Sequence, residues 1–245
     1  MLSGKEKLEA DILAIISDSP QAVGCGAISA VLRDRGIIVS EATVGRLLRD
    51  LDRQGYTLKA GFQGRVLSAS GKERLRELAN KDKSLKWSAD FIRVVQGHTK
   101  EQLLEVLVAR RAIESELAAL AAVNGSPQEM RTVKEILERQ KAAVGRGEGS
   151  AQEDVEFHAM IAAMAGNRVL AAAIGLIRHD TQLSPVLEYI RRTVLSSMYI
   201  DHQKIYNAIA DRNAEAARLA MVEHINNIIA DVNKYWEKSA TAADE

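Results

Sequence analysis

The chain of 245 residues is long enough for one or two domains, and 47% of its residues are apolar, enough for a real core. An aromatic content of 4%, only three prolines and an abundance of Ala and Leu favour a mostly helical protein, while a single cysteine excludes a disulfide framework. The net charge is zero, yet residues 1–100 hold 17 Lys and Arg against 12 Asp and Glu, so an anionic partner would meet this part rather than the rest.

Signals for a membrane or for export are not found in the sequence. No apolar run approaches the ~20 residues that a membrane span needs. The first residues, Met1 to Lys7, lack the apolar core of a signal peptide. Together with the lone cysteine, Cys25, this predicts a cytoplasmic protein without a membrane partner.

The order of elements over residues 1–80 is that of a winged helix-turn-helix. The predicted elements are helices over about 5–17, 28–36 and 41–54, a β-hairpin of 56–59 with 65–68, and a helix from Ser70. Ser40 is a good N-cap for the third helix, which ends at Gly55. The alternative is a small helical domain whose arginines are only solvated.

The third helix and the hairpin carry the residues that would meet DNA. Short polar and Arg side chains on the helix can read base edges in the major groove, and basic side chains of the wing can follow phosphates. The candidate DNA-binding residues are Ser40, Thr43, Arg46, Arg49, Lys59 and Arg65. Over about residues 8–78 the sequence resembles the winged helix-turn-helix domain found beside ribonuclease R and in some prokaryotic repressors. The resemblance is carried by Ile28-Ser-Ala-Val-Leu32, by Val39 to Asp52 and by Gly64-Arg65. This resemblance implies a DNA-binding regulator.

The rest of the chain has a helical pattern and no β pattern. Residues 81–99 are polar at first and predict a linker, and residues 239–245 predict a polar tail. Between them, over 100–238, we expect five or six long helices in an antiparallel bundle. The predicted breaks fall at Asn124-Gly125, 145–149, Gly166-Asn167, Ser184-Pro185 and 211–213.

Four residues of this bundle have the types and the spacing of a metal site. Asp154 and His158 are four apart, so they share one face of a helix. His202 and His224 each lie 11 residues from Asn213, and a chain reversal there brings both rings to the same level. One carboxylate and three imidazoles suit a divalent ion. A four-apart Asp/His pair is also common by chance, so the alternative is a set of surface or core histidines that bind nothing.

Three stretches carry a second resemblance. They are Leu107-Val-Ala-Arg110-Arg-Ala-Ile-Glu114, Asp154-Val-Glu-Phe157-His158 with Ala165-Gly-Asn167, and Asp201-His202 with Asp211 and His224-Ile225. Over about residues 100–235 the sequence resembles the FadR-type C-terminal (FCD) domain, the effector domain of a large GntR subfamily. This resemblance implies that Asp154, His158, His202 and His224 hold a metal beside which a small organic acid binds. Zinc is the expected ion, with nickel, manganese and iron as alternatives.

The same resemblance suggests residues that bind the effector. Arg110 matches a position that can pair with a ligand carboxylate, and a guanidinium does this bidentately. The alternative for Arg110 is a pair with Glu114, four residues on. Asn167 is the second candidate, with capping of the following helix as its alternative. His98 and His179 receive no ligand role.

These observations predict a homodimeric regulator in which two winged helices bind half-sites of a double-stranded DNA operator and a carboxylate effector alters operator affinity. The DNA-reading motif of the GntR family is not found, so the N-terminal part belongs to a different winged-helix lineage. One alternative is a metal-dependent hydrolase, with Glu153 or Glu156 as general base, although helical spacing turns Glu156 away from Asp154 and no nucleophile motif is found. Another is a non-catalytic RNA-binding or structural dimer module. We predict no enzymatic activity.

Overall fold

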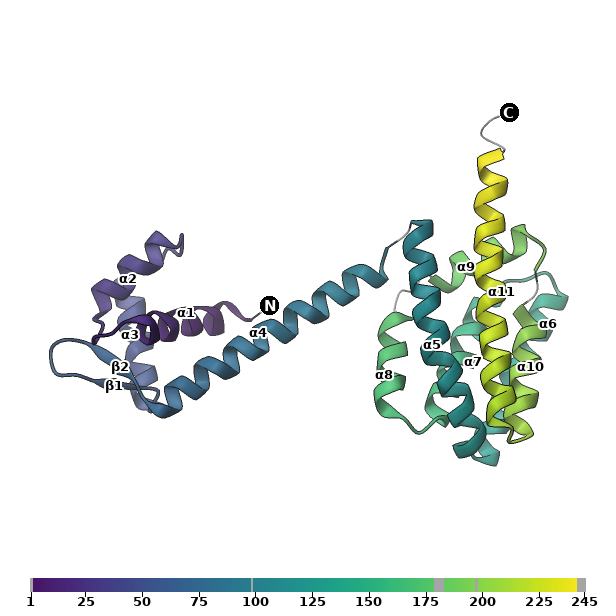
Figure 1. Ribbon diagram of the computed structural model, residues 1–245, viewed down its shortest axis with the longest axis horizontal. Coiled ribbons are helices and arrows are strands. Elements are labelled where there is room, and N and C mark those ends of the chain that lie inside the picture. Colours follow the sequence, from purple (N-terminus) through teal and green to yellow (C-terminus); the bar gives the residue numbers. More distant parts are fainter. Residues whose placement is uncertain (1, 98, 179–182, 197, 242–245) are drawn as a thin grey trace. The chain divides into compact units, whose positions relative to one another are not determined.

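The computed structural model describes residues 2–97, 99–178, 183–196 and 198–241 (Figure 1). The chain forms two compact units, Met1–Phe91 and Ile92–Glu245, which are described separately here. His98, His179 and the last four residues of the predicted tail lie outside the described residues. Most of the predicted linker, 81–99, continues helix α4 (Ala69–Val95), and the start of the predicted tail continues the last helix to Thr241.

The first unit has the predicted three helices and hairpin. Its elements are α1 (Gly4–Asp18), α2 (Cys25–Asp34), α3 (Glu41–Arg53), β1 (Thr57–Lys59), β2 (Arg65–Leu67) and the first part of α4. The strands pair antiparallel, with Leu58 opposite Val66. The core is apolar and draws on all four helices, with Ile12, Leu13, Ile28, Leu32, Val44, Leu48, Leu51 and Leu78 among its buried residues. The winged-helix prediction is therefore confirmed as a fold.

Local chemistry fixes the ends of α3 and the wing. The Ser40 hydroxyl accepts a hydrogen bond from the Thr43 backbone N–H at 3.2 Å, so Ser40 is the expected N-cap. Gly64 has φ +130° and packs against Val23, where an added Cβ would lie 2.3 Å from the Val23 carbonyl carbon. Only glycine fits there, and its small size lets β2 extend its pairing to Val23.

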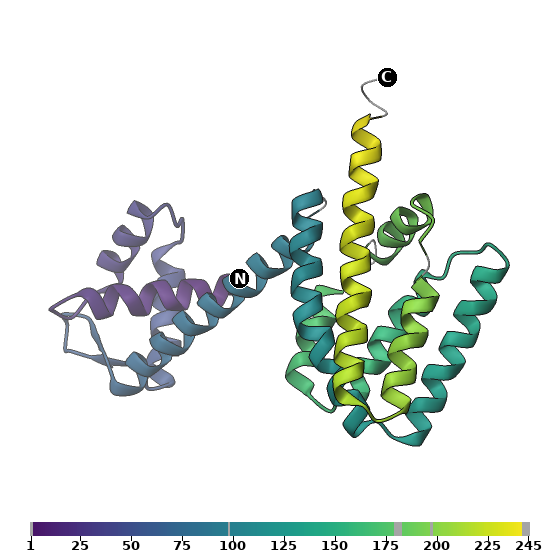
Figure 2. The same cartoon turned by 45° about the vertical axis from the view of Figure 1, so that its right-hand side comes forward.

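The second unit is an all-helical bundle, within the part of the chain that the structure describes. Its seven helices are α5 (Lys100–Asn124), α6 (Pro127–Gly145), α7 (Ala151–Met164), α8 (Arg168–Ile177), α9 (Leu183–Thr193), α10 (Met198–Ala210) and α11 (Ala214–Thr241). We expected five or six, and the number rises because α8 and α9 are separate helices. The long helices α5 and α11 lie side by side along the bundle (Figure 2). Phe157, Ile161, Met221 and Ile225 are in its core.

The turn between α10 and α11 is the reversal that the histidine spacing predicts. Arg212 adopts a left-handed conformation with φ 57°, and the Asn213 side chain accepts a hydrogen bond from the Ala216 N–H at 3.0 Å. The two helices then run back along each other. As a result, the rings of His202 and His224 lie 4.7 Å apart between centroids.

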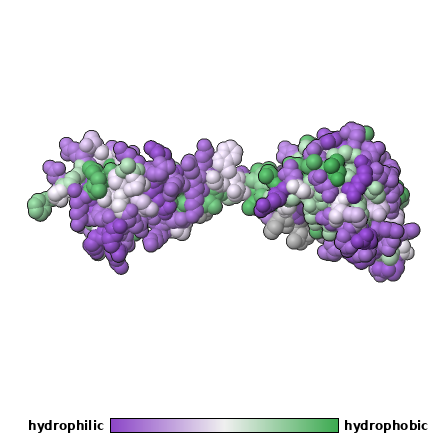
Figure 3. All heavy atoms as spheres, turned by 90° about the horizontal axis from the view of Figure 1, so that it is seen from below, coloured by the Kyte–Doolittle hydropathy of each residue, from purple (hydrophilic) through white to green (hydrophobic). Residues whose placement is uncertain are grey.

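The face of each unit seen in Figure 3 is mostly polar. Figure 3 shows hydrophilic residues, in purple, over most of the visible surface of each unit. Among the described residues, no helix combines the length and the apolar character that crossing a membrane would require.

Candidate metal centre

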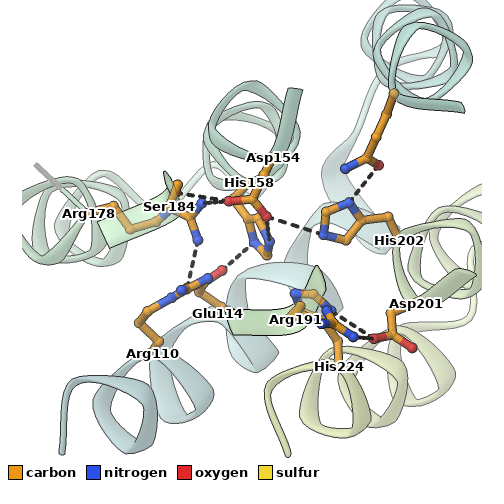
Figure 4. A network of polar contacts seen from close by, with 11 residues as sticks. Arg110, Glu114, Asp154, His158, Arg178, Ser184, Arg191, Asp201, His202 and His224 are labelled. Atoms are coloured by element: carbon orange, nitrogen blue, oxygen red, sulfur yellow. Dashed lines mark hydrogen bonds and ion pairs between the residues drawn. The ribbon is translucent and has the colours of Figure 1, made fainter. Parts of the chain in front are cut away.

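Three helices bring the four predicted ligands together inside the second unit. Asp154 and His158 come from α7, His202 from α10 and His224 from α11. One ligand atom from each of the four lies within 4.8 Å of all the others, and all four residues are buried. Figure 4 shows the Asp154 carboxylate and the rings of His158 and His202 pointing toward one another. The predicted juxtaposition of the four side chains is therefore present.

Each imidazole is held through its Nδ1 atom. His202 Nδ1 donates to Gln140 Oε1 on α6 at 2.9 Å, and His224 Nδ1 lies 3.4 Å from Asp201 Oδ2. His158 Nδ1 pairs with the Glu114 carboxylate on α5. With the proton of each ring placed on Nδ1, the Nε2 lone pairs are directed inward.

The Nε2 atoms of the three histidines are buried acceptors that could coordinate a cation. Each is buried and finds no hydrogen-bond partner among the residues that the structure describes. Native proteins rarely leave buried polar atoms unsatisfied, so three such acceptors facing one another mark a candidate ligand site. The donor set of three imidazole nitrogens and one carboxylate oxygen fits a divalent ion such as zinc.

The two oxygens of the Asp154 carboxylate have different neighbours. Oδ2 accepts hydrogen bonds from Arg178 Nη2 at 2.7 Å and from Ser184 Oγ at 3.0 Å. Oδ1 lies 3.5 Å from the Nε2 atoms of both His158 and His202. One oxygen is thus anchored by α9 and by the end of α8, and the other faces the histidines.

The protonation states suit metal binding. Burial would raise the pKa of Asp154, but Arg178 and the neighbouring histidines hold it well below its usual range. Burial lowers the pKa of His202 well below its ordinary value, and burial together with His158 and Arg191 lowers the pKa of His224 to about 4. Near neutral pH, Asp154 is therefore ionised and these two rings are neutral, as metal ligands must be.

Arg110 lies next to this cluster, with Glu114 between it and His158. Arg110 Nε donates to Glu114 Oε1 at 2.6 Å, which is the intrahelical pair that the spacing allowed. The pair is not on the surface, because the Arg110 side chain is only 1% exposed. The pKa of Glu114 is held well below its usual range by Arg110, His158 and Arg178, against the effect of burial.

A further set of buried polar residues supports the ligands, and the sequence patterns did not single it out. Asp201 accepts from Arg191 Nη2 at 3.0 Å and from Asn227 Nδ2 at 3.1 Å, and Arg191 Nε also pairs with Asp231 at 2.9 Å. The residues missed are Gln140, Arg178, Ser184 and Arg191. They come from α6, α8 and α9, and no spacing signal links them to the histidines. Asp201 had a signal, since it precedes His202 in a stretch that resembles the FCD domain.

Two other predicted residues have local partners. The Asn167 side chain accepts from the N–H groups of Val169 and Leu170, both at 3.1 Å, so it caps α8. Its effector role stays a prediction. Glu156 pairs with Arg139 on the exterior of the bundle, so it faces away from the histidines as the helical spacing indicated.

The predicted DNA-binding residues lie on α3 and the wing. Arg46, Arg49 and Lys59 are exposed and line a shallow groove together with Arg53, Asp50 and Asp52. Arg65 is different, because its side chain is 15% exposed and its guanidinium pairs with the Asp52 carboxylate through Nε and Nη2, both at 2.9 Å. Ser40 is engaged in the cap, and Thr43 shares a 2.9 Å hydrogen bond with it. The DNA contacts of all six residues stay predictions.

The fold and the cluster define a class: a winged helix joined in one chain to a helical bundle that contains a buried Asp/His cluster. Comparison with known proteins gives the family. The model of the FCD domain matches residues 105–227, and the chain belongs to the FCD domain family. The ribonuclease R winged-helix domain matches residues 10–75. Both resemblances found in the sequence are confirmed.

The similar curated proteins are regulators by name. The HTH-type transcriptional regulator LutR of Bacillus subtilis is 24% identical over 145 residues, which are 57% of this chain and 66% of LutR. The Uxu operon regulator of Haemophilus influenzae is 30% identical over 129 residues, 51% of this chain and 48% of that protein. The match therefore spans between about half and two thirds of these relatives. Among solved structures, E. coli McbR/YncC is 19% identical with a TM-score of 0.49, covering 96% of this chain and 100% of that one.

Proposed function

We propose that this chain is a DNA-binding transcriptional regulator of the GntR type whose FCD domain binds a divalent metal ion and a small organic acid. The observation that carries the proposal is the buried cluster of Asp154, His158, His202 and His224, whose ligand atoms lie within 4.8 Å of one another. The FCD family membership and the regulator names of the relatives support the regulatory part.

The four residues would hold the ion through three imidazole nitrogens and Asp154 Oδ1. We propose zinc as the ion, with nickel, manganese and iron as alternatives that the same donors accept. When bound, the ion supplies a Lewis acid to which an oxygen of an organic acid can coordinate. Gln140, Asp201 and Glu114 orient the three rings through their Nδ1 atoms.

Arg110 would bind the carboxylate of the effector. Its side chain is buried, and it is separated from His158 only by Glu114, which contacts both. A guanidinium pairs well with a carboxylate in such a poorly solvated place. We therefore propose that one small acid contacts Arg110 and the ion together.

The winged helix would bind the operator. The exposed Arg46 and Arg49 on α3 and Lys59 on β1 supply positive charge near the recognition helix, and the unit that holds them is the one with excess basic residues. We propose that two chains pair and that each contributes one winged helix to a half-site. The effector changes operator affinity only if it binds the two arrangements of the dimer with different affinity.

The proposal is tested with the full chain loaded with zinc. Its preferred duplex is first selected from a pool of random-sequence DNA, and its affinity for that duplex is then measured with and without a panel of small carboxylates. We expect one duplex to be enriched and at least one acid to change its affinity at least about fivefold, the lower end of typical coupling energies. The proposal fails if no duplex is enriched, or if operator affinity is the same with and without zinc and every acid.

A further inference from the structure

The tip of the wing presents an aromatic ring to solvent. Phe62 lies in the connection between β1 and β2 and is fully exposed, at 111% of its reference area. Figure 1 shows this connection projecting away from the helices of the first unit. A ring in this position adds nothing to the core, whereas it would contribute strongly to an interface that covers it. The ring is therefore available to another molecule.

The backbone of the tip holds this ring in place. The Ala60 N–H donates to the Gly64 carbonyl at 2.9 Å, and the Gln63 N–H donates to the Ala60 carbonyl at 3.1 Å. Gly61 has φ +60°, a left-handed conformation that glycine adopts at no steric cost. Phe62 is thus at the outer corner of a closed turn rather than in a loose loop, which reduces the entropy lost when its ring enters a partner.

The wing is tied to the predicted recognition helix by one carboxylate. Asp52, in the last turn of α3, accepts from Thr57 Oγ1 on β1 at 2.7 Å and from Arg65 Nε on β2 at 2.9 Å. Both strands of the hairpin are therefore fixed to α3 through the same side chain. Because β1 has three residues, the tip is held about 10 Å along the strand from Thr57.

The groove between α3 and β1 is basic. Its two carboxylates, Asp50 and Asp52, are each paired with an arginine. The basic residues that line it are Arg46, Arg49, Arg53 and Lys59. From residue 53 to residue 72, the stretch that contains the whole wing, the sequence has four basic residues and no Asp or Glu. The charge of this surface therefore suits an anionic partner.

The ring and the groove together suit double-stranded DNA. Side chains alternate along a strand, so Lys59 lines the groove while Leu58 is on the opposite face of β1. DNA has phosphates on its outside, which the groove would meet, and apolar base faces inside, which a ring can reach only by entering the stack. A single projecting side chain also fits the minor groove, which is about 6 Å wide.

We propose that Phe62 is an apolar wedge: while α3 lies in the major groove, the ring enters the adjacent minor groove and partly unstacks one base step. This inference rests on the proposed function and adds to it a deformation of the operator. Inserted apolar side chains kink the duplex, and pyrimidine–purine steps unstack most easily, so such a step should lie beside each half-site. Gln63, next to the ring, carries an amide that can reach the acceptors of the minor-groove edge.

The experiment uses the zinc-loaded full chain and the duplex enriched by selection, with 2-aminopurine replacing one adenine at a time, because this base becomes more fluorescent when it is unstacked. We expect the wild type to raise the fluorescence at least about twofold at one step beside each half-site. Phe62→Ala should abolish this rise and weaken binding at least about fivefold, the lower end of the effect of removing a base-stacking ring. The slope of log binding constant against log salt should stay unchanged, because no charge is lost.

Two further variants separate the ring from the rest of the wing. Leu58→Ala is the matched control, because Leu58 is 55% exposed on the face of β1 away from the groove, and it should leave affinity and fluorescence within about twofold. Phe62→Leu keeps an apolar wedge and should retain at least about half of the rise. Since the ring is fully exposed, Phe62→Ala should keep the stability of the wild type in urea denaturation.

The outcomes distinguish this inference from the proposed function. A bound duplex with the same affinity and the same fluorescence rise for wild type and Phe62→Ala overturns the inference and leaves the proposed function standing. A wild type that binds without any fluorescence rise also overturns it, because no step is then unstacked. A changed self-association of DNA-free Phe62→Ala, at unchanged DNA affinity, assigns the ring to a protein contact and overturns it as well. If selection enriches no duplex, the proposed function itself fails.

Discussion

The two units of the chain place their charged residues in opposite ways. In the winged helix the core is apolar, and the basic residues Arg46, Arg49 and Lys59 are on the outside. In the bundle, arginines, carboxylates and three imidazoles are enclosed together. Enclosing charges is costly unless they are paired, and an apolar replacement is often as stable. This difference agrees with the proposed function, in which the first unit binds DNA through its surface and the second binds a metal ion and an acid in its interior.

The comparison is tested most strongly by two Glu/Arg pairs of the bundle that share helix α5. Glu114 pairs with the buried Arg110, and Glu116 pairs with the half-exposed Arg218. Glu114→Gln removes the carboxylate that pairs with the buried Arg110, while Arg178 keeps its pair with Asp154, and it should lower the free energy of unfolding by about 3–5 kcal/mol. Glu116→Gln should lower it by less than about 1 kcal/mol. Urea denaturation measures the free energy of unfolding of both variants. Equal losses would mean that the buried pair matters no more for stability than the exposed pair.

The pH dependence of the metal-free bundle should also reflect its interior. The pKa of His224 falls from 6.5 to about 4 on folding, so between these values the unfolded chain binds more protons than the folded chain. Stability is therefore full above about pH 6.5 and declines as the pH falls, by about 2–3 kcal/mol at pH 4.5. His202 acts in the same direction. Urea unfolding of the metal-free chain at pH 7 and pH 4.5 checks this, and a His224→Gln variant should decline less. A stability that stays constant or rises toward acid would be contrary to this account.

The support of the metal ligands should be measurable without changing a ligand. Gln140 accepts from His202 Nδ1, and Gln140→Leu removes that acceptor. Loss of such a partner should weaken zinc binding about 10- to 100-fold. The matched control is Gln203→Leu, since Gln203 is on the same helix as His202 and its side chain forms hydrogen bonds with Tyr199 and Asn207 rather than with a histidine of the cluster. Zinc affinity by competition with a fluorescent chelator distinguishes them, and an unchanged Gln140→Leu would mean that the amide does not orient the ring.

The surface of the winged helix should show smaller effects that depend on salt. Arg46→Ala and Arg49→Ala should each reduce the slope of log binding constant against log salt by about one, with little change in stability. Arg65→Ala should in addition lower the free energy of unfolding by about 2 kcal/mol, because Arg65 pairs with Asp52. The measurements are titrations of a duplex at several salt concentrations and urea denaturation. Unchanged slopes for both Arg46→Ala and Arg49→Ala would place the DNA-binding surface elsewhere.

The helices, the hairpin and the four candidate metal ligands could be predicted from the sequence because each depends on local spacing. The reversal at Asn213 follows from the equal distances to His202 and His224, and the shared face of Asp154 and His158 follows from helical periodicity. The wing and its recognition helix follow from turn residues and apolar spacing in the same way.

The residues that contact the four candidate ligands could not be predicted in this way. Arg178 and Gln140 meet Asp154 and His202 only through the packing of separate helices, which periodicity does not encode. The spacing of Arg110 and Glu114 was visible, but a four-apart pair looks the same whether it is exposed or enclosed. The partner of Arg65 lies 13 residues away across a turn, so its pairing with Asp52 was equally hidden.

The most direct measurement is the metal content of the purified full chain, by mass spectrometry after equilibration with zinc and removal of free ions. The account predicts about one ion per chain for the wild type and less than about a tenth of that for the His202→Ala, His224→Ala double variant, which has lost two of four ligands. A wild type without bound metal, or a double variant that retains the same amount, would contradict the account.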